Sequence, residues 1–333
     1  MLKFLIVGLG SMGKRRIRNL RCLKEGSVIG YDPCKDRRED AQQKYEIPVY
    51  SEFEEAMATD PDALVICTPP DRHTQYARIA LGGRKHFFTE ASVVDDGMDE
   101  VIHLAARTPV VAAPSCTMRF HPSIARIKAL VEENVIGPIL CFTYHCGQYL
   151  PDWHPWEDYR SFYVAKRETG GCREIVPFEL AWLTWILGQP EMISCLKGKL
   201  SGLEADIDDV YQILIRFQRS TLGHLLVDII SRVPYRTCRL ISESGVIEWN
   251  WADKCVRVFL SEGKRWMDYP EPRDGDDVGP FGNEHMYVEE MRCFVEAIRG
   301  KRVYPYTLAE DKKILDLLYA AERSSDESIH VRR

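Results

Sequence analysis

The sequence predicts two domains: a Rossmann domain with a doubly wound parallel α/β sheet in residues 1–120, and an α+β domain with an antiparallel sheet flanked by helices in residues 121–333. Three observations support this prediction. A chain of 333 residues is too long for one typical core. A glycine motif follows the first apolar segment, and strand and helix patterns alternate as far as residue 114. From residue 138 onward, strand-like segments follow one another with short linkers.

The composition is that of a globular protein without a nucleic-acid or membrane partner. Hydrophobic residues make up 45% and charged residues 28% of the chain, and the formal net charge is -6. Nucleic-acid-binding proteins usually present a basic face instead, and no apolar run reaches the roughly 18 residues of a membrane span. The 11 cysteines form no Cys-x-x-Cys pair and no zinc-ligand spacing. We therefore expect reduced thiols, no bound metal and a cytoplasmic location.

Residues 2–20, LKFLIVGLGSMGKRRIRNL, predict a buried strand, a glycine turn and a helix. In the spacing G-x-G-x-x-G, the first glycine permits the tight turn, the second lets a pyrophosphate approach the backbone, and the third lets helix and strand pack closely. The start of the helix then offers unpaired N–H groups to the phosphates. The expected cofactor contacts in this turn are Gly8, Gly10, Ser11, Met12 and Gly13.

The second strand, SVIGYD, ends in Asp32. An acid at this position accepts hydrogen bonds from the adenosine ribose hydroxyls and repels a 2′-phosphate. NAD is therefore favoured over NADP as the cofactor. Arg37 and Arg38 follow closely, and they either soften this preference or lie on the solvated surface. A glycine turn without any ligand is the alternative to dinucleotide binding.

Strands are next expected at 62–70, 85–90 and 109–114, with helices at 73–82 and 97–106. In a doubly wound sheet, ligands bind beyond the carboxyl ends of the strands. The residues expected for this reason near the nicotinamide half of the cofactor are Thr68, Pro69, His73, Glu90 and Arg119. For the histidine, the alternative is a solvent-facing position at the start of a helix.

The second domain is expected to contain strands at 138–150, 192–200, 209–217, 221–230 and 235–244, and a hairpin at 246–260. Their short or polar linkers are typical of an antiparallel sheet. Helical periodicity predicts helices at 284–299 and 308–323, and composition predicts a flexible loop at 271–283.

The segment 148–160, QYLPDWHPWEDYR, concentrates aromatic, basic and proline residues in a stretch that is neither regular helix nor regular strand. Aromatic rings are flat apolar surfaces on which sugar rings stack, and polar groups between them fix hydroxyl groups. The alternative is that the tryptophans pin a long loop to the domain. The substrate contacts expected here are Tyr149, Trp153, Trp156 and Arg160.

Several motifs together resemble the Gfo/Idh/MocA family of oxidoreductases, named for glucose–fructose oxidoreductase and inositol dehydrogenase. They are the glycine turn, CTPPDRH at 67–73, HFFTEAS at 86–92, CTMRFHPSI at 116–124, and the helical stretches 169–188 and 283–300. The resemblance spans essentially the whole chain. It implies a Rossmann domain followed by a large open antiparallel sheet, NAD-dependent chemistry on a sugar, and a homodimer or homotetramer formed through the free face of that sheet.

Two positions depart from the pattern that the resemblance implies. Most family members carry Glu-Lys-Pro where this chain has Glu90-Ala91-Ser92, and the lysine is thought to help proton transfer beside the nicotinamide. In the second domain the family's acid falls at Glu174, while its histidine position is Phe178. The usual proton-handling groups are therefore incomplete, although the fold is unaffected.

Without the lysine, the candidates for proton transfer are Glu174, His154 and Tyr159, in that order of preference. Burial raises the pKa of a carboxyl group towards working pH, which favours the glutamate. Pro177 suits the first position of the second-domain helix, which places Glu179 in its first turn, where it meets the helix dipole. Phe178 is expected to pack.

The basic residues expected near this site are Arg119, Arg160, Lys166 and Arg173, with His121 and His154 nearby. Guanidinium groups bind carboxylates and phosphates in a bidentate manner, so these residues favour an anionic substrate over a neutral sugar. A plain structural pair between Arg173 and Glu174 is the alternative.

The leading hypothesis is an NAD-dependent oxidoreductase that transfers a hydride between nicotinamide and a sugar or sugar-derived acid, including nucleotide-linked sugars of surface-sugar or nonulosonic-acid pathways. A second hypothesis is an epimerase or lyase that retains NAD and uses it transiently. The third is a non-catalytic NAD-binding sensor, since the family's fold also serves a transcriptional co-repressor of galactose metabolism. Ala91 and Phe178 are the main support for the sensor.

Overall fold

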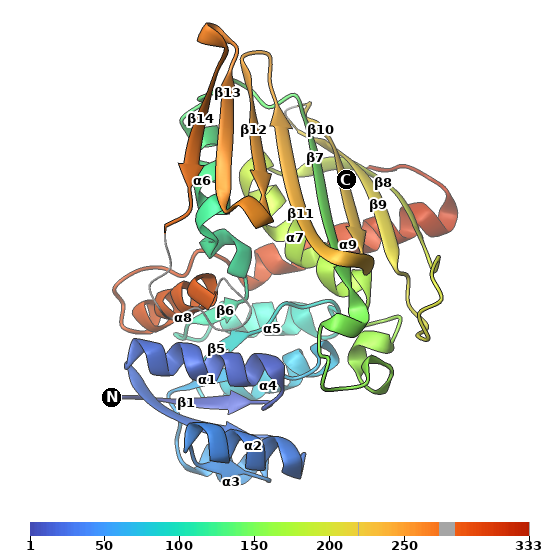
Figure 1. The fold of residues 1–333 in the computed structure, drawn as a ribbon. Helices are drawn as coiled ribbons and strands as arrows, with labels where there is room; N and C mark the ends of the chain where they lie inside the picture. The colour runs from blue at the N-terminus through green and yellow to red at the C-terminus, as the bar shows by residue number, and fades with distance from the viewer. Residues whose placement is uncertain (219, 273–283, 333) are drawn as a thin grey trace. The chain divides into compact units, whose positions relative to one another are not determined.

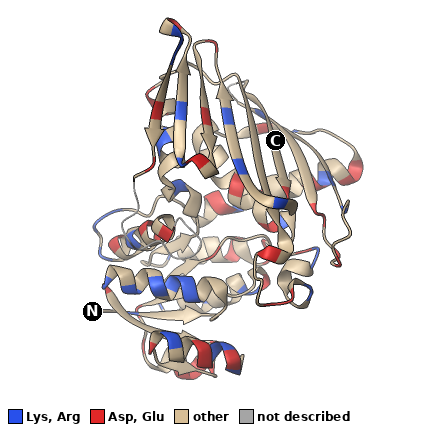
Figure 2. Ribbon diagram, viewed as in Figure 1, with Lys and Arg blue, Asp and Glu red and all other residues tan. Residues whose placement is uncertain are grey.

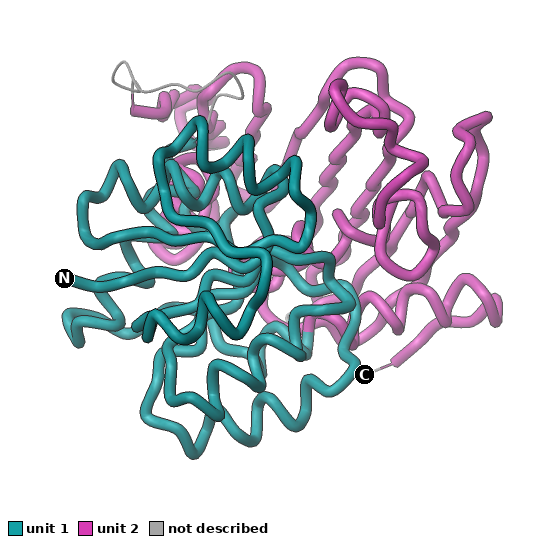
Figure 3. Tube along the Cα trace, turned by 90° about the horizontal axis from the view of Figure 1, so that it is seen from below, with its two compact units in different colours: residues 1–120, 274–313 teal, residues 121–273, 314–333 magenta. Residues whose placement is uncertain are grey.

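A computed structural model describes residues 1–218, 220–272 and 284–332, and the chain divides into two compact units (Figure 3). Unit 1 comprises residues 1–120 and 274–313, and unit 2 comprises residues 121–273 and 314–333. The domains expected from the sequence, 1–120 and 121–333, do not include the return of the chain to unit 1 at residues 274–313. The loop expected at 271–283 lies, from residue 273 onward, outside the described residues.

Unit 1 contains a parallel sheet with the strand order β3-β2-β1-β4-β5-β6, which is the predicted doubly wound arrangement (Figure 1). Its strands are β1 (Leu2–Val7), β2 (Gly26–Tyr31), β3 (Val49–Tyr50), β4 (Ala63–Ile66), β5 (His86–Thr89) and β6 (Ala112–Pro114). Its helices are α1 (Ser11–Leu23), α2 (Lys35–Tyr45), α3 (Phe53–Ala58), α4 (His73–Gly82), α5 (Met98–Ala105) and α8 (Glu284–Ile298). The prediction of a Rossmann domain is confirmed.

The two central strands of this sheet explain why their sequences are continuously apolar. Phe4 to Val7 of β1 and all of β4 are fully buried, because helices cover both faces of a doubly wound sheet. Helix α8, which lies far from α1 in the sequence, packs against it.

Unit 2 contains, in the part of the chain that the structure describes, a sheet with the strand order β14-β13-β12-β11-β7-β10-β9-β8-β15. Its strands are β7 (Cys141–Tyr149), β8 (Pro190–Gly198), β9 (Val210–Phe217), β10 (Leu222–Asp228), β11 (Ile230–Ile241), β12 (Gly245–Asn250), β13 (Cys255–Leu260), β14 (Arg265–Pro270) and β15 (Val331–Arg332). The predicted open sheet is confirmed. It is mixed rather than purely antiparallel, because β7 and β10 pair in parallel while their neighbours pair antiparallel.

Helices α6 (Pro122–Glu132) and α7 (Cys172–Leu187) pack against one face of this sheet (Figure 1). Helix α9 (Leu308–Glu327) has residues in both units, and its Ser324 accepts a hydrogen bond from the backbone of β8. On the other face, apolar side chains of β8 to β11 are exposed; they include Leu196, Leu214, Leu222 and Tyr235.

Helix α7 starts earlier than the sequence predicts. It begins at Cys172, directly after Gly171 with its positive φ of 66°, so Pro177 lies inside the helix rather than at its first position. Because proline has no N–H group, the carbonyl of Arg173 lacks its usual helical partner. Glu174 therefore occupies the first turn, and Glu179 lies in the buried interior of the helix.

Among the described residues there is no helix with both the length and the apolar character that crossing a membrane requires. Acidic and basic residues are interspersed over both units (Figure 2).

We expect Gly13→Ala to destabilise the protein by at least about 2 kcal/mol, because a methyl group at this position would meet the carbonyl oxygen of Gly8 at 1.9 Å. Thermal unfolding followed by circular dichroism measures the effect. Gly82→Ala is the matched control: Gly82 ends α4, an added methyl group meets nothing within 4 Å, and its midpoint should stay equal or rise. Equal midpoints for Gly13→Ala and the parent would contradict the close packing of α1 on β1.

Candidate functional site

The glycine turn of unit 1 has the geometry that a dinucleotide requires. Gly8 has a φ of 95°, and a Cβ atom there would lie 2.8 Å from the carbonyl oxygen of Cys67. A Cβ atom on Gly10 would instead meet only a guanidinium nitrogen of Arg37, at 3.9 Å. Gly10 is also the N-cap of α1, where no side chain caps the first N–H groups. The close approach of Cys67 thus explains why residue 8 is glycine. Gly10 instead leaves space in front of the N-terminus of α1, and helix N-termini are sites at which a pyrophosphate binds.

Asp32 is buried at the carboxyl end of β2, with 3% of its surface exposed. Its Oδ2 accepts a hydrogen bond from Leu9 N and its Oδ1 one from Cys34 N, each at 2.8 Å. These two backbone donors fix the carboxylate and leave further lone pairs for ribose hydroxyls. The adjacent Arg38 donates to the backbone carbonyls of Asp32 and Pro33.

Thr68 and His73 lie beyond the carboxyl end of β4, with Pro69 between them capping a short 3-10 helix, η1 (Pro70–Arg72). The His73 ring is 4% exposed and donates from Nε2 to the Thr68 carbonyl at 3.0 Å, so it does not face solvent. Burial lowers the pKa of His73, which keeps the ring neutral and leaves a lone pair on Nδ1. That Nδ1 and the Thr68 hydroxyl are buried without a hydrogen-bond partner among the described residues. These two buried atoms lie beyond the carboxyl end of β4, and they are suited to hydrogen bonds with polar groups of a cofactor.

Glu90, at the carboxyl end of β5, is held by an arginine that the sequence analysis missed. Arg16 of α1 is fully buried and forms a bidentate pair with Glu90, with Nε–Oε1 at 2.6 Å and Nη2–Oε2 at 3.1 Å. Its Nη2 also lies 2.8 Å from Oε2 of Glu290. Burial by itself disfavours the guanidinium charge, but the two carboxylates outweigh it and raise the pKa of Arg16 well above its usual range. Arg16 lies three residues after Gly13 and four before Leu20, on the buried stripe of α1, and this spacing was the available signal.

Arg119 ends a short 3-10 helix, η2 (Thr117–Phe120), and its charge is already engaged within unit 1. It stacks on the Tyr306 ring at 4.4 Å, donates to the Pro305 carbonyl at 3.0 Å, and lies 3.8 Å from a carboxylate oxygen of Glu310. The Tyr306 hydroxyl donates to the buried Asp311 at 3.1 Å. Burial raises the pKa of Asp311 to about 7, against smaller opposing effects of Tyr306 and Ser92.

Glu174, the preferred proton-transfer candidate, lies in unit 2 in the first turn of α7. Its Oε1 accepts a hydrogen bond from Tyr163 at 3.0 Å. The residue as a whole is partly exposed, but Oε2 is buried and has no hydrogen-bond partner among the described residues. Since the carboxyl oxygens carry the charge, their burial decides the titration and raises the pKa of Glu174 to about 7, while Tyr163 lowers it.

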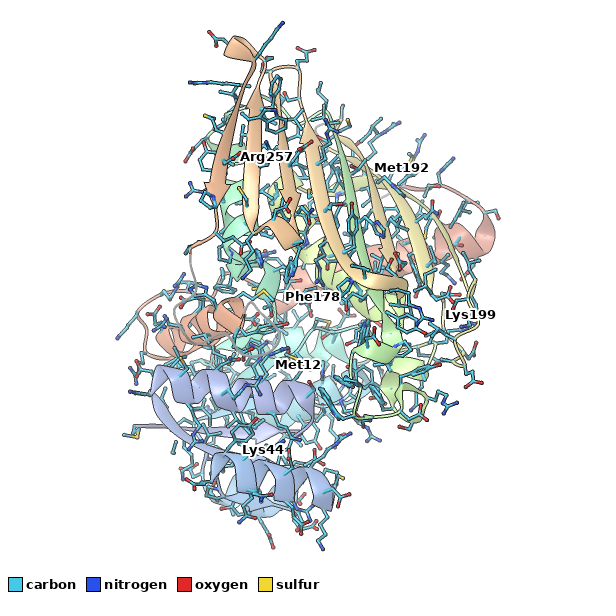
Figure 4. The ribbon with its side chains drawn as sticks, viewed as in Figure 1. Met12, Lys44, Phe178, Met192, Lys199 and Arg257 are labelled. Atoms are coloured by element: carbon cyan, nitrogen blue, oxygen red, sulfur yellow. The ribbon has the colours of Figure 1, made fainter. Side chains whose placement is uncertain are left out.

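The neighbouring Arg173 does not pair with Glu174. It donates to Glu322 of α9 at 2.6 Å and to the backbone carbonyl of Glu168, and its guanidinium lies 5.5 Å from the Tyr319 ring. Arg173 therefore ties α7 to α9. Phe178 is a partly exposed residue of α7, and Met12 lies on α1 (Figure 4).

The segment after β7 forms an aromatic stack. The His154 ring lies between Trp156 and Phe162, with centroids at 5.3 and 5.4 Å and nearly parallel planes. Trp156 is 64% exposed at the outer end of this stack, whereas Trp153 is only partly exposed. Tyr149 lies beneath the guanidinium of Arg232, at 3.8 Å.

The remaining polar candidates of this segment face an acidic loop that joins β8 to β9. Arg160 is exposed and pairs with Asp158 and Glu204, and the Tyr159 hydroxyl accepts a hydrogen bond from Glu204 N at 3.1 Å. Lys166 is exposed. Tyr159 thus binds a backbone rather than the other proton-transfer candidates.

His121 has a structural position. It is 1% exposed, caps α6 by accepting a hydrogen bond from Ser123 N at 3.2 Å, and stacks on Trp251 with centroids 4.8 Å apart. Glu179 also differs from the expected dipole contact: it accepts hydrogen bonds from Tyr144, Trp182 and Arg236 at 2.8, 2.7 and 3.1 Å.

The two units thus offer complementary chemistry. In unit 1, the glycine turn, Asp32, Thr68, His73 and Glu90 all follow the carboxyl ends of strands of one parallel sheet, the edge at which doubly wound folds bind ligands. Unit 2 supplies a carboxyl group whose pKa of about 7 suits general acid–base work at neutral pH. No group of three metal-ligating side chains occurs in the described ranges.

Comparison with known proteins agrees with both units. Residues 2–114 match a family model described as the oxidoreductase family, NAD-binding Rossmann fold, of the Gfo/Idh/MocA group, and residues 124–248 match the Gfo/Idh/MocA C-terminal domain. A myo-inositol 2-dehydrogenase from Thermotoga maritima is 23% identical over 98% of this chain and 97% of its own length.

Solved structures share the fold at low identity. An oxidoreductase from Agrobacterium radiobacter in complex with NAD+, L-tartaric acid and magnesium has a TM-score of 0.89 and 14% identity, covering 99% of this chain and 98% of its own. A levoglucosan dehydrogenase in complex with NADH has a TM-score of 0.86 and 17% identity, with coverage of 99% and 98%.

We expect Asp311→Asn to remove a pH dependence of stability. Because the pKa is about 7 in the folded state and 3.8 ordinarily, the folded state keeps a proton that the unfolded state has released, so the free energy of unfolding falls as the pH rises between these values. The variant should lack this fall, which amounts to at most about 4 kcal/mol. Urea unfolding at pH 5 and pH 8 measures it.

The exposed Asp253→Asn is the control for this experiment and should keep the slope of the parent protein. Part of the slope should persist in Asp311→Asn, because burial also raises the pKa of Glu174 to about 7. A slope in this variant equal to that of the parent protein would contradict the contribution of Asp311.

Proposed function

Because the chain belongs to the Gfo/Idh/MocA family of oxidoreductases and carries its NAD-binding Rossmann domain, we propose that it oxidises a hydroxyl-bearing carbon of a sugar or cyclic polyol with NAD. The observation that carries this proposal is Glu174, a buried carboxyl group with a pKa of about 7 and with one oxygen that has no hydrogen-bond partner among the described residues. It supplies the proton acceptor that Ala91 and Phe178 do not.

In the proposed reaction the substrate loses a hydride from carbon and a proton from oxygen. The hydride would pass to NAD, and accepting it is the chemistry that the cofactor would supply. The carboxylate of Glu174 takes the hydroxyl proton, and the carbon–oxygen bond becomes a carbonyl. In unit 1, the glycine turn and Asp32 would hold the pyrophosphate and the ribose. The candidates Thr68 and His73 would offer a hydroxyl and a neutral imidazole nitrogen to polar groups of the cofactor.

We propose a neutral substrate rather than the anionic one that the basic residues first indicated. Arg119, Arg160 and Arg173 each have a carboxylate within 4 Å, which leaves little uncompensated charge for an anion. Two of the similar proteins are named for neutral compounds, myo-inositol and levoglucosan, while the Agrobacterium radiobacter oxidoreductase is in complex with an acid, L-tartaric acid. The Trp156 stack, with its exposed outer ring, would give a sugar ring an apolar surface.

The test is NADH formation, followed by absorbance, on a panel of sugars and cyclic polyols. We expect turnover with at least one of them, with kcat/KM rising as the pH passes about 7, because the base must be ionised. Glu174→Gln should lower kcat by roughly a hundredfold to ten-thousandfold and leave the affinity for NAD unchanged. Full activity of this variant would remove Glu174 from the mechanism.

Two other outcomes have their own signatures. Protein that releases NAD only on denaturation and converts a sugar without net NADH would act as an NAD-retaining epimerase or lyase. Protein that binds NAD and turns over no sugar would be a sensor.

We further propose that a second copy of the chain covers the exposed face of the unit 2 sheet, forming a homodimer or homotetramer. Leu196 and Leu214 are 74% and 58% exposed there, on neighbouring strands, and burial of such a surface is favourable. We also propose a cytoplasmic location, which agrees with all eleven cysteines being unpaired.

We expect Leu214→Arg to shift the protein towards monomer in sedimentation velocity, because a charge would have to be buried in the interface. Val303→Arg is the control: Val303 is 87% exposed in unit 1 and its substitution should leave the oligomer intact. If both variants sediment like the parent protein, the sheet face is not the interface.

A further inference from the structure

The two oxygens of Glu174 have different surroundings. Oε1 accepts the hydroxyl hydrogen of Tyr163 at 3.0 Å. Oε2 is buried and has no hydrogen-bond partner in the described part of the chain. A buried carboxylate oxygen without a donor is costly, and proteins usually satisfy such atoms. The asymmetry therefore points to a hydrogen-bond donor at Oε2 that the described residues do not supply.

Tyr163 reaches Glu174 because the chain between them folds back tightly. Tyr163 begins a short 3-10 helix, η5 (Tyr163–Ala165), and its carbonyl accepts hydrogen bonds from Lys166 N at 3.1 Å and from the Thr169 hydroxyl at 2.8 Å. A Cβ atom on Gly170 would lie 2.4 Å from Cα of Val164, so only glycine permits this approach. The run Thr169-Gly170-Gly171 thus brings η5 against the start of α7.

Contacts with residues on either side of it also hold the segment that carries Tyr163 in place. Phe162 contacts the Tyr163 ring edge-on, with centroids at 5.8 Å, and belongs to the aromatic stack with His154. Arg167 pairs with Asp206 at 2.6 Å and Asp208 at 3.1 Å on the loop between β8 and β9. These contacts come from both sides of Tyr163 in the sequence, so the tyrosine is fixed before any substrate binds.

We propose that Tyr163 is a positioning residue that holds Glu174 through Oε1 and leaves Oε2 as the atom that exchanges the proton with the substrate hydroxyl. This inference rests on the proposed function and names a residue that neither the sequence patterns nor the family resemblance indicated. In the step, the substrate O–H bond breaks and an O–H bond forms at Oε2. The Tyr163 hydroxyl keeps its own hydrogen throughout and donates it more strongly while the carboxyl is ionised.

A hydrogen bond from Tyr163 that sets the protonation of Glu174 has a consequence that a purely structural hydrogen bond does not have. A donor on a carboxylate stabilises its charged form, so removing the hydroxyl should raise the pKa of Glu174 further above its ordinary value. The pH at which kcat/KM rises should then move upward with it. A tyrosine that only stabilises the loop would change the unfolding midpoint or KM and leave this pH unchanged.

The experiment compares Tyr163→Phe with the parent protein in two measurements. Infrared difference spectra, with Glu174→Gln identifying the band, follow the protonated carboxyl of Glu174 against pH. Steady-state kinetics give the pH profile of kcat/KM with a sugar from the panel. We expect the infrared midpoint and the kinetic midpoint to rise together by roughly one pH unit, and kcat at neutral pH to fall about tenfold. The Kd for NAD should not change.

Tyr211→Phe is the matched control, because Tyr211 also donates its hydroxyl to a carboxylate, Glu322, at 3.3 Å in the same unit. It should leave both midpoints unchanged. Gly170→Ala is a second variant, which keeps the hydroxyl but displaces η5, and it should reproduce the effects of Tyr163→Phe.

The outcomes separate the inference from the proposed function. An infrared midpoint that does not move in Tyr163→Phe overturns the inference, whatever the activity. A midpoint that moves while the kinetic pH profile stays in place overturns the role in proton transfer. If the parent protein titrates at Glu174 but turns over no sugar, the proposed function fails, and the role of Tyr163 in catalysis fails with it.

Discussion

The buried guanidinium of Arg16 is the interaction on which the organisation of unit 1 depends. It joins α1, which follows the glycine turn, to Glu90 at the end of β5 and to Glu290 of α8. Glu290 in turn accepts hydrogen bonds from Cys116 N at 2.6 Å and the Thr117 hydroxyl at 2.7 Å, just before residue 120. A buried ion network adds little net stability compared with apolar packing, but removing one partner costs about 3–5 kcal/mol. The Arg16 network therefore acts mainly by determining which helices and strands contact one another.

In unit 2, a buried ion pair likewise fixes the position of a helix, α7. Glu179, in the interior of α7, receives donors from Tyr144 of β7 and Arg236 of β11 as well as from Trp182. The helix is thereby held on the sheet by the buried pair of Glu179 and Arg236. One turn earlier, Glu174 has a single donor, and burial raises its pKa to about 7. Among the described residues, Glu179 thus has three side-chain donors where Glu174 has one.

The family's lysine position, Ala91, lies beside a residue with a structural contact. Ala91 is followed by Ser92, whose hydroxyl hydrogen-bonds the buried Asp311 within unit 1. The charges that seemed free for an anionic substrate are engaged: Arg160 by Asp158 and Glu204, Arg173 by Glu322. The chain therefore combines an NAD-binding Rossmann domain with a second unit in which burial raises the pKa of the Glu174 carboxyl to about 7.

The sequence by itself determined the parallel sheet and the glycine turn, because strand burial and glycine spacing are local properties of the chain. The predicted helix start, Pro177, was wrong, because α7 begins at Cys172 and includes Glu174 in its first turn. Only the tertiary structure decided that Arg16 forms an ion pair with Glu90, that His121 caps a helix, and that Tyr163 donates a hydrogen bond to Glu174. These contacts join residues whose partners are set by packing and burial, and the energy of a buried charge depends on neighbours that no local pattern records.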